Sequence, residues 1–369
     1  MNILHIYKDY HPVKGGIENM IRWLAEAQAA AGHEVTVLVA SLNGRSSVQT
    51  VNGVNIHRIA RWGTVASTPL TPGLPLAIRQ YRPDIAHLHS PYPPGELLNA
   101  LLGRARFSVM TYHSDIIRQR ALLAFYRPLL QRVLRKLDVI MPTSANYIES
   151  SPFLRRHRDK CRVIPLGIDL ARFNRSRPAL AAEIRQGVGK PIVLFVGRLR
   201  YYKGLDTLIA AMARLPEAKL ILVGGGSLRP KLEAQASALG LTERVHFAGE
   251  VSDADLPAYF RAADCFVLPS NSRAEAFGIV LLEAMASGLP VVSTELGTGT
   301  SFVNVHGQTG FVVPPQDEAA LAGAIKQLIG DPEVRRRFAR AALARVRAEF
   351  AKERMVERVM QVYAGLLAA

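Results

Sequence analysis

Residues 191–204 read PIVLFVGRLRYYKG, and residues 220–226 read LILVGGG. Each stretch begins with an apolar run of strand length and ends in glycine, and a helical pattern from about Gly204 to Arg214 separates the two. Strands that are apolar on both faces and alternate with helices are typical of a parallel sheet covered on both sides. This region therefore predicts a βαβ unit of a doubly wound α/β domain.

The same alternation continues in both directions along the chain. It predicts two Rossmann-like doubly wound domains in tandem, residues 1–170 and 171–345, joined near Gly167–Lys190. A last helix, from about Asp331 to Leu367, looks longer than one domain needs. The strands expected in the first series are Asn2–Tyr7, Val35–Ala40, Val54–Ile59, Ile85–His89, Phe107–Tyr112 and Val139–Pro142.

Composition narrows the class of protein. Of 369 residues, 49% are apolar and 21% charged, which is close to the globular average and excludes disordered and fibrous chains. No apolar run approaches the roughly 18 residues of a membrane span. The start, MNILHIYKDYHP, lacks a signal-peptide pattern and is interpreted as a strand. With only Cys161 and Cys265, the sequence favours a reducing cytoplasm.

The chain is strongly basic, with a formal net charge of +16. Such a charge suits nucleic acid, an anionic membrane surface or small molecules that carry phosphate. No basic platform interleaved with aromatic residues and no helix-turn-helix pattern is visible, so no nucleic-acid partner is expected.

Two glycine-containing loops follow expected strands, at the edge where open α/β sheets bind ligands. Gly15-Gly16 follows the first strand, but no GxGxxG dinucleotide fingerprint stands there, and an ordinary tight turn explains the pair equally well. Gly197, Arg198 and Lys203 follow the 191–196 strand. Two cations on a loop that opens a helix suit a diphosphate.

The strongest motif is SNSRAEAFGIVLLEAMASGLPVV, at 270–292. Glu275 and Glu283 stand eight residues apart, around a Phe277-Gly278 turn and the start of an apolar helix. Glu283 can accept both hydroxyls of a ribose, and Glu275 hydroxyls of a sugar beyond the phosphates. The alternative interpretation is that Glu275 compensates the helix dipole and that Glu283 is a surface residue. That interpretation explains Glu283 poorly, because its neighbours in the sequence are apolar. Amides expected to meet phosphate or sugar oxygens are those of Gly278, Ile279 and Val280.

These motifs, with PLGIDLARF at 165–173 and HPVKGGIE at 11–18, resemble glycosyltransferase family 4 over nearly the whole chain. The resemblance implies the GT-B architecture, with two Rossmann-like domains and the sugar nucleotide mostly on the C-terminal one. It implies retention of anomeric configuration and no required metal or other cofactor. It also implies that a C-terminal helix, residues 346–369, packs back on the N-terminal, acceptor-side domain.

The resemblance assigns roles residue by residue. Arg198 and Lys203 would hold the donor diphosphate, Glu283 the ribose and Glu275 the transferred sugar, while His113 of TYHSDI would approach the C6 region of that sugar. Without the family context, His113 would be interpreted as a buried strand-end histidine. The predicted catalytic residues are His113, Glu275, Arg198 and Lys203. The predicted donor-binding residues are Gly15, Gly16, Gly197, Gly225, Val251, Phe277, Gly278, Ile279, Val280 and Glu283.

The expected reaction is transfer of a hexose from a nucleoside-diphosphate sugar to a lipid-linked or saccharide acceptor, in glycolipid or surface-polysaccharide synthesis. Backbone groups near Gly225 and Val251 would read the base, and such groups do not separate uridine from guanosine. Similarity to mannosyl- and rhamnosyltransferases favours a GDP-hexose over UDP-glucose or a UDP-N-acetylhexosamine. A sugar-nucleotide epimerase on the same fold is the less favoured alternative.

Two polar motifs are assigned no ligand. Asp253-Ala254-Asp255 is formally a DxD metal motif, but it precedes an amphipathic helix, and Ser252 or Asp253 is expected to cap that helix. His87 and His89 alternate on a strand, and with no third ligand in view a strand-end role is favoured over zinc.

Two basic stretches remain, Arg118–Lys136 and Phe153–Arg162. The first mixes leucine and phenylalanine with arginine, as an interfacial helix does, although a solvated helix face is the alternative. Because a lipid-linked acceptor would favour docking on anionic lipid, we expect peripheral association with the inner face of the cell membrane.

Overall fold

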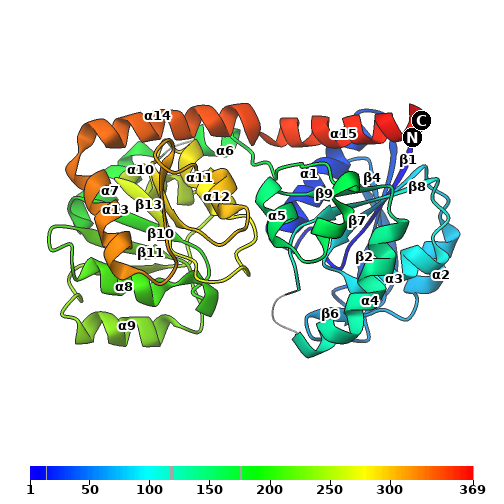
Figure 1. Ribbon diagram of the computed structural model, residues 1–369, viewed down its shortest axis with the longest axis horizontal. Helices are drawn as coiled ribbons and strands as arrows, with labels where there is room; N and C mark the ends of the chain where they lie inside the picture. Colours follow the sequence, from blue (N-terminus) through cyan, green and yellow to red (C-terminus); the bar gives the residue numbers. More distant parts are fainter. Residues whose placement is uncertain (14, 117–119, 175–176, 369) are drawn as a thin grey trace. The chain divides into compact units, whose positions relative to one another are not determined.

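A computed structural model describes residues 1–13, 15–116, 120–174 and 177–368, with no side-chain detail at 120–125 and 174. The chain divides into two compact units (Figure 1). The first comprises Met1–Gly167 with Lys352–Ala369, and the second comprises Ile168–Ala351. Each unit is an α/β sandwich built on its own parallel sheet.

The first unit holds a seven-stranded sheet in the order β3-β4-β2-β1-β7-β8-β9, parallel except for the edge strand β3. Leaving β3 aside, this is the doubly wound order 3-2-1-4-5-6. The central strands are buried along most of their length, as strands covered on both faces must be. The strands are β1 (Asn2–Ile6), β2 (Glu34–Ala40), β3 (Ser47–Val51), β4 (Val54–Ile59), β7 (Ile85–Ser90), β8 (Phe107–Tyr112) and β9 (Val139–Pro142).

Helices cover both faces of this sheet, and a small hairpin of β5 (Gly63–Val65) and β6 (Thr68–Leu70) stands apart from it. The C-terminal helix α15 packs beside α1 and buries Met355, Val359 and Tyr363 (Figure 1). The helices are α1 (Gly16–Ala30), α2 (Leu74–Gln80), α3 (Pro93–Leu102), α4 (Arg120–Lys136), α5 (Ala145–Ser150), the 3-10 helix η1 (Leu154–Lys160) and α15 (Lys352–Ala368).

The second unit holds a six-stranded, all-parallel sheet in the order β12-β11-β10-β13-β14-β15, again the order 3-2-1-4-5-6. Its strands are β10 (Ile192–Val196), β11 (Lys219–Val223), β12 (Val245–Gly249), β13 (Cys265–Leu268), β14 (Val291–Thr294) and β15 (Gly310–Val313). Its helices are α6 (Ala171–Asn174), α7 (Pro178–Val188), the 3-10 helix η2 (Tyr201–Lys203), α8 (Leu205–Met212), α9 (Arg229–Ala238), α10 (Leu256–Ala262), α11 (Ile279–Ala286), α12 (Thr300–Val303), α13 (Glu318–Gly330) and α14 (Pro332–Glu349).

The prediction of a single long C-terminal helix from Asp331 to Leu367 is wrong, because the structure has two helices there, α14 and α15. The break falls at Phe350-Ala351. The Phe350 side chain is buried in the second unit, and its carbonyl accepts a hydrogen bond of 2.9 Å from the amide of Ile168. That bond to a distant segment replaces the helical bond, so the helix ends there.

No helix in the described part of the chain combines the length and apolarity needed to cross a lipid bilayer.

Candidate active site

The strongest candidate site lies where two neighbouring strands of the second unit end. β10 and β13 are parallel and adjacent, and the sheet order continues from them in opposite directions, toward β11 and toward β14. This is the topological switch point, where open α/β sheets bind ligands. The loop 197–204 follows β10 and the loop 269–278 follows β13, so two of the predicted motifs share one edge of the sheet.

These two loops contact each other through their backbones. The amide of Asn271 donates to the carbonyl of Tyr202 at 2.9 Å. Gly204 has φ 64°, and a Cβ there would lie 2.0 Å from the carbonyl oxygen of Pro269. Only glycine combines that left-handed conformation with so close an approach, so Gly204 permits the two loops to meet.

The contact brings together Lys203 and Glu275, two residues predicted from separate motifs. The Lys203 ammonium donates to Glu275 Oε2 at 2.5 Å, and Ser270 Oγ donates to the same oxygen at 3.2 Å. Both charged side chains are largely buried, with exposed fractions of 10% and 12%. Burial alone would lower the pKa of Lys203, but the neighbouring carboxylate outweighs burial and the pKa is raised. The site therefore holds a fixed cation.

Arg198, the other cation predicted to hold the diphosphate, lies on the same loop but is exposed. The structure therefore brings Lys203, and not Arg198, into contact with the 269–278 loop. An arginine side chain is long, and its guanidinium is only weakly hydrated, so an exposed arginine at this edge of the sheet can still bind an anionic ligand there.

Helix α11 begins directly after Glu275, Phe277 and Gly278. Gly278 has φ 77°, and its conformation turns the chain from the loop into the helix. First-turn amides have no partner within a helix, so those of Ile279 and Val280 point out of its N-terminus as donors for an anion. The loop itself is fixed, since Thr298 Oγ1 donates to the Glu275 carbonyl at 2.8 Å. Phe277 is buried beneath it.

Glu283 lies one turn further along α11, with 18% of its side chain exposed. Arg172 Nη1 lies 4.0 Å from Glu283 Oε1, and Arg172 also pairs with Asp253 at 2.9 Å. Burial raises the pKa of Glu283 to about 7, against the opposing effect of Arg172. Burial therefore favours the neutral form of Glu283 more than it would for an exposed glutamate.

The DxD motif is engaged in ion pairs with arginine. Asp253 pairs with Arg172, and Asp255 with Arg177. The residue that caps α10 is Asp255, so the expectation that Ser252 or Asp253 caps the helix is wrong; Ser252 Oγ instead accepts a hydrogen bond of 3.1 Å from the Asp255 amide in the turn before the helix. Asp253 does not cap the helix.

The glycine loops after β10, β11 and β12 lie against one another. The Leu199 amide donates to the Gly225 carbonyl at 2.9 Å. A Cβ at Gly224 would lie 2.2 Å from the Gly197 carbonyl oxygen, which excludes any other residue there. Gly225 and Val251, predicted to read the base, are both partly exposed on these loops.

Three predicted residues belong to the first unit. Gly15 caps the N-terminus of α1 and Gly16 opens that helix, after β1. A Cβ at Gly15 would lie 2.1 Å from the end of the Glu18 side chain, so a larger residue there would require the Glu18 carboxylate to move. His113 follows β8 and is 97% buried. Gly15, Gly16 and His113 are therefore placed at the carboxyl edge of the first sheet.

His113 belongs to a cluster of four buried histidines, which contains the third histidine that was not in view when His87 and His89 were judged from sequence. A third histidine, His5, lies opposite His87 on β1, and the nitrogen atoms of His5, His87 and His89 lie within 4.8 Å of one another. The alternation along the 85–90 strand gave no sign of His5, because His87 and His89 lie 82 and 84 residues from His5 in the sequence. Burial lowers the pKa of His5 to about 4 and that of His113 to about 3.

We predict that the first unit loses stability in mild acid. Each clustered histidine has a folded pKa below its ordinary 6.5, so between the two values the unfolded chain binds more protons. Stability is therefore full above about pH 6.5 and falls as pH drops toward 4, by about 2 kcal/mol at pH 5 for each of His5 and His113. Both tryptophans, Trp23 and Trp62, lie in this unit, so urea unfolding followed by tryptophan fluorescence reports it selectively.

The unfolding midpoint should drop clearly between pH 7 and pH 5, and His87→Phe should reduce the pH dependence. An equal midpoint at both pH values would contradict the neutral cluster.

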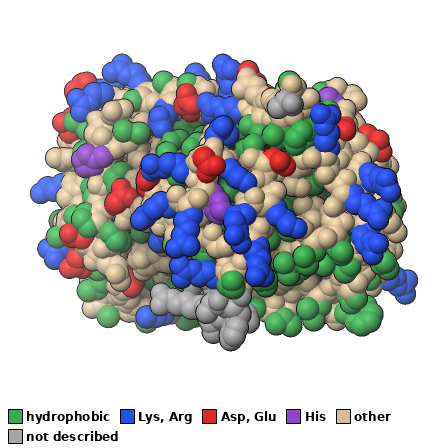
Figure 2. All heavy atoms as spheres, turned by 45° about the vertical axis from the view of Figure 1, so that its right-hand side comes forward, with side chains coloured by type: hydrophobic (Ala, Val, Ile, Leu, Met, Phe, Trp, Pro, Cys, Tyr) green, Lys and Arg blue, Asp and Glu red, His purple; other side chains and the backbone are tan. Residues whose placement is uncertain are grey.

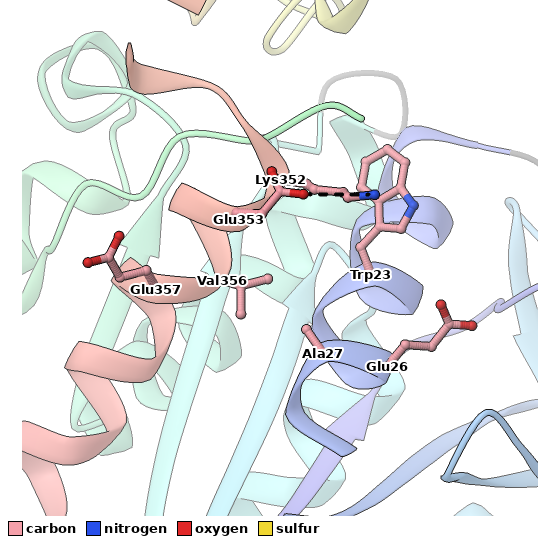
Figure 3. A pocket seen from close by; sticks show the side chains of 7 residues that line it. All are labelled: Trp23, Glu26, Ala27, Lys352, Glu353, Val356 and Glu357. Atoms are coloured by element: carbon pink, nitrogen blue, oxygen red, sulfur yellow. Dashed lines mark ion pairs between the residues drawn. The ribbon is translucent and has the colours of Figure 1, made fainter. Parts of the chain in front are cut away.

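A groove of about 500 Å³ lies elsewhere in the first unit, between α1 and α15 (Figure 3). Three glutamates, one lysine and the apolar Trp23, Ala27 and Val356 line it, and none of the predicted site residues does. Its one drawn ion pair joins Lys352 to Glu353 at 3.9 Å. Its acidic lining is a poor match for a diphosphate.

Two functional candidates were missed from sequence. Ser270 hydrogen-bonds Glu275, and Arg172 contacts Glu283. Arg172 lies within the 165–173 motif, which suggested the family without suggesting a role. Ser270 directly follows the apolar stretch 265–269, at the carboxyl end of an expected strand, so it could have been proposed from sequence as a site residue.

Residues 14–172 match the sequence family described as Glycosyltransferase Family 4, and residues 176–345 match Glycosyl transferases group 1. The chain is 41% identical to the D-rhamnosyltransferase WbpZ of Pseudomonas aeruginosa, covering 95% of this chain and 92% of that one. It is 34% identical to the O-antigen chain mannosyltransferase C of Escherichia coli, covering 100% and 99%.

Among solved structures, sucrose-phosphate synthase from Thermosynechococcus elongatus superposes with a TM-score of 0.81 at 28% identity, covering 100% of this chain and 99% of that one. The fold and the two matched families define a GT-B glycosyltransferase. The chain belongs to glycosyltransferase family 4 and is a hexosyltransferase.

Proposed function

We propose that this enzyme transfers mannose or rhamnose from a GDP-linked donor, with retention of configuration, to a lipid-linked or saccharide acceptor in surface-polysaccharide or glycolipid synthesis. The names of the two relatives just described support the sugar and the pathway class. A phosphatidyl-myo-inositol mannosyltransferase of Mycobacterium leprae, 31% identical over 95% of this chain, supports transfer to a lipid-borne acceptor.

The single observation that carries a nucleoside-diphosphate-sugar site is the buried Lys203–Glu275 pair, beside the free amides of α11. Lys203 and the α11 N-terminus offer fixed positive charge to a diphosphate, with Arg198 as a second, exposed cation. Glu275 offers carboxylate oxygens to the hydroxyls of the transferred sugar. Glu283 would accept the ribose hydroxyls, and backbone groups near Gly225 and Val251 would meet the base. The first unit would hold the acceptor.

The chemistry follows from this charge distribution. When the glycosidic bond to the diphosphate breaks, negative charge develops on the leaving oxygen, and fixed cations and amides stabilise that charge without reorganising. The acceptor hydroxyl then attacks from the leaving-group face and passes its proton to the diphosphate. We propose that no metal ion is required, because Lys203 and the helix amides supply the charge that a metal would otherwise bring.

Donor and mechanism are tested together in one assay. Purified enzyme receives GDP-mannose, GDP-rhamnose, UDP-glucose or UDP-N-acetylglucosamine with a polyprenyl-diphosphate-linked monosaccharide, with and without EDTA. The proposal expects an α-linked product from a GDP-hexose, at a rate that EDTA leaves unchanged. Transfer from UDP-sugars alone would contradict the base assignment. A changed sugar nucleotide released without acceptor would indicate an epimerase.

We further propose that the enzyme docks on anionic membrane through charge rather than through an inserted apolar helix. The interfacial helix expected over 118–136 is not supported where the structure describes side chains, because Leu130, Val133 and Leu134 of α4 are buried in the core. Residues 118 and 119 lie outside the described residues. The exposed face of α4 carries cations, and η1 packs beside it, since Lys160 donates to the Arg135 carbonyl at 2.8 Å.

This basic surface consists of Arg127, Arg132, Arg135, Lys136, Arg155, Arg156, Arg158 and Arg162, all exposed. Lys and Arg side chains also gather on the face of the molecule drawn in Figure 2. Clusters of this kind are attracted to anionic lipid at about 1 kcal/mol per cation.

We predict that replacing Arg132, Arg135 and Arg156 by alanine weakens binding to phosphatidylglycerol-containing vesicles about 100-fold at low salt. The matched control replaces Arg336, Arg337 and Arg340, which are three exposed arginines on α14 of the second unit. Vesicle flotation measures both. Equal binding of wild type and both triple variants would refute docking through this surface.

A further inference from the structure

Four buried histidines lie on one face of the first unit's sheet, beneath α1 and α15. They come from three neighbouring strands or strand ends: His5 on β1, His87 and His89 on β7, and His113 after β8. All four are at most 3% exposed. Three of them form a continuous hydrogen-bonded chain that begins at Gln28 of α1 and ends at His113, so the state of one end depends on the other.

The direction of the chain is determined at Gln28. Its amide nitrogen donates to the thioether of Met360 on α15 at 3.6 Å, and a thioether cannot donate in return. Gln28 Oε1 therefore faces His5 Nε2, 2.8 Å away, and can only accept. His5 must carry its proton on Nε2, and since burial lowers its pKa to about 4, its Nδ1 is an acceptor at neutral pH.

The same logic passes through two more rings. His5 Nδ1 lies 3.1 Å from His89 Nε2, so His89 donates there and its own Nδ1 becomes an acceptor. His113 Nε2 lies 3.4 Å from His89 Nδ1 and donates to it. Burial keeps both rings neutral, because it lowers the pKa of His89 and His113 well below neutrality. His113 is left with a lone pair on Nδ1, which has no hydrogen-bond partner among the described residues.

We propose that Gln28, His5 and His89 are positioning residues that hold His113 with its proton on Nε2, so that Nδ1 accepts a hydrogen bond from a sugar hydroxyl of the substrate. The substrate contact rests on the proposed function, whereas the tautomer does not. The chain gives the core of the first unit a role beyond packing: it makes His113 Nδ1 a hydrogen-bond acceptor, so that this atom can take a donor such as a hydroxyl group.

A metal site among His5, His87 and His89 is the competing interpretation, since their nitrogens lie close enough. The hydrogen bonds disfavour it. His5 and His89 use both ring nitrogens within the chain, and His87 bonds Tyr363 at 2.5 Å and Thr111 at 2.7 Å. Each ring therefore has both nitrogens engaged, and a metal ion would have to break several of these bonds.

The test is nitrogen NMR of the full chain labelled at histidine, which distinguishes protonated from unprotonated ring nitrogens without any assay of transfer. The variant His89→Phe keeps a buried ring and removes the acceptor for His113. The matched control is His87→Phe, which changes an equally buried histidine on the same strand that lies outside the chain. Gln28→Leu removes the amide oxygen that accepts a hydrogen bond from His5, at the start of the hydrogen-bonded chain.

We expect wild-type His113 to be protonated at Nε2 and unprotonated at Nδ1, and to stay so in His87→Phe. In His89→Phe and Gln28→Leu both tautomers should be populated, and kcat of each should fall about tenfold, the effect of losing one net hydrogen bond. Saturation with the polyprenyl-diphosphate-linked monosaccharide, the acceptor that the first unit would hold, should shift the Nδ1 resonance of His113.

A proton on Nδ1 in the wild type, or one unchanged tautomer in His89→Phe, would overturn the chain. EDTA-sensitive resonances of His5, His87 and His89 would overturn it in favour of a metal. The expected tautomer with no Nδ1 shift when the acceptor is bound would overturn the substrate contact alone. If the tautomers behave as expected and no donor supports transfer, the proposed function fails while the chain stands.

Discussion

Glu275→Gln should reduce transfer at least about 1,000-fold while changing the Kd for a nucleoside diphosphate less than about threefold. Glu275 lies beyond the diphosphate cation Lys203 in the switch-point site, and glutamine keeps its size while removing the charge that accepts sugar hydroxyls. Interactions of that kind that strengthen in the transition state account for losses of this order when removed. Steady-state transfer kinetics and calorimetry of the nucleotide measure the two quantities.

Glu275→Gln also removes the ion-pair partner of the largely buried Lys203 ammonium, so the free energy of unfolding of this variant must be measured. Asp264→Asn is the matched control: Asp264 pairs with Arg185 at 2.8 Å and lies just before β13, at the other end of the strand that Glu275 follows. It should cost similar stability and leave transfer unchanged. Equal losses of nucleotide binding and transfer in Glu275→Gln would refute the sugar-contacting role.

Lys203→Ala should weaken nucleoside-diphosphate binding about 10- to 100-fold, the range of one or two charge-assisted hydrogen bonds. Transfer should fall further, because the ammonium also stabilises charge that develops on the leaving diphosphate. The loss of the cation leaves the Glu275 carboxylate buried without its partner, which repels an anionic ligand and adds to the effect. Adding Arg198→Ala should weaken binding again, by less, since Arg198 is exposed.

Arg185→Ala serves as the control for this series, because it removes the cation of another partly buried ion pair, one that lies away from the switch point. Near-normal kinetics of the Arg198→Ala, Lys203→Ala double variant would remove the diphosphate assignment.

Much of the fold could be predicted from sequence because its strands are apolar on both faces. That signal is local, and it located β10, β11 and β13 to within a residue or two. It failed for β3, whose residues are all exposed, and for the break between α14 and α15. Helical periodicity runs through Phe350, and only a backbone bond to Ile168, far away in sequence, ends the helix there.

The candidate site shows the same division. Lys203 and Glu275 each stand in a recognisable local motif, so both could be predicted, although their direct ion pair depends on β10 and β13 being neighbours. The contact of Arg172 with Glu283 and the chain from Gln28 to His113 depend on register between distant segments. No pattern within a window of residues contains that information, and a single sequence offers no other source.

The most direct test of the central claim, a metal-independent nucleoside-diphosphate site at the switch point, is calorimetric binding of GDP, UDP and ADP with and without EDTA. We predict that GDP binds most tightly and that EDTA leaves its Kd unchanged. Binding of none of the three, or binding that EDTA abolishes, would contradict the claim.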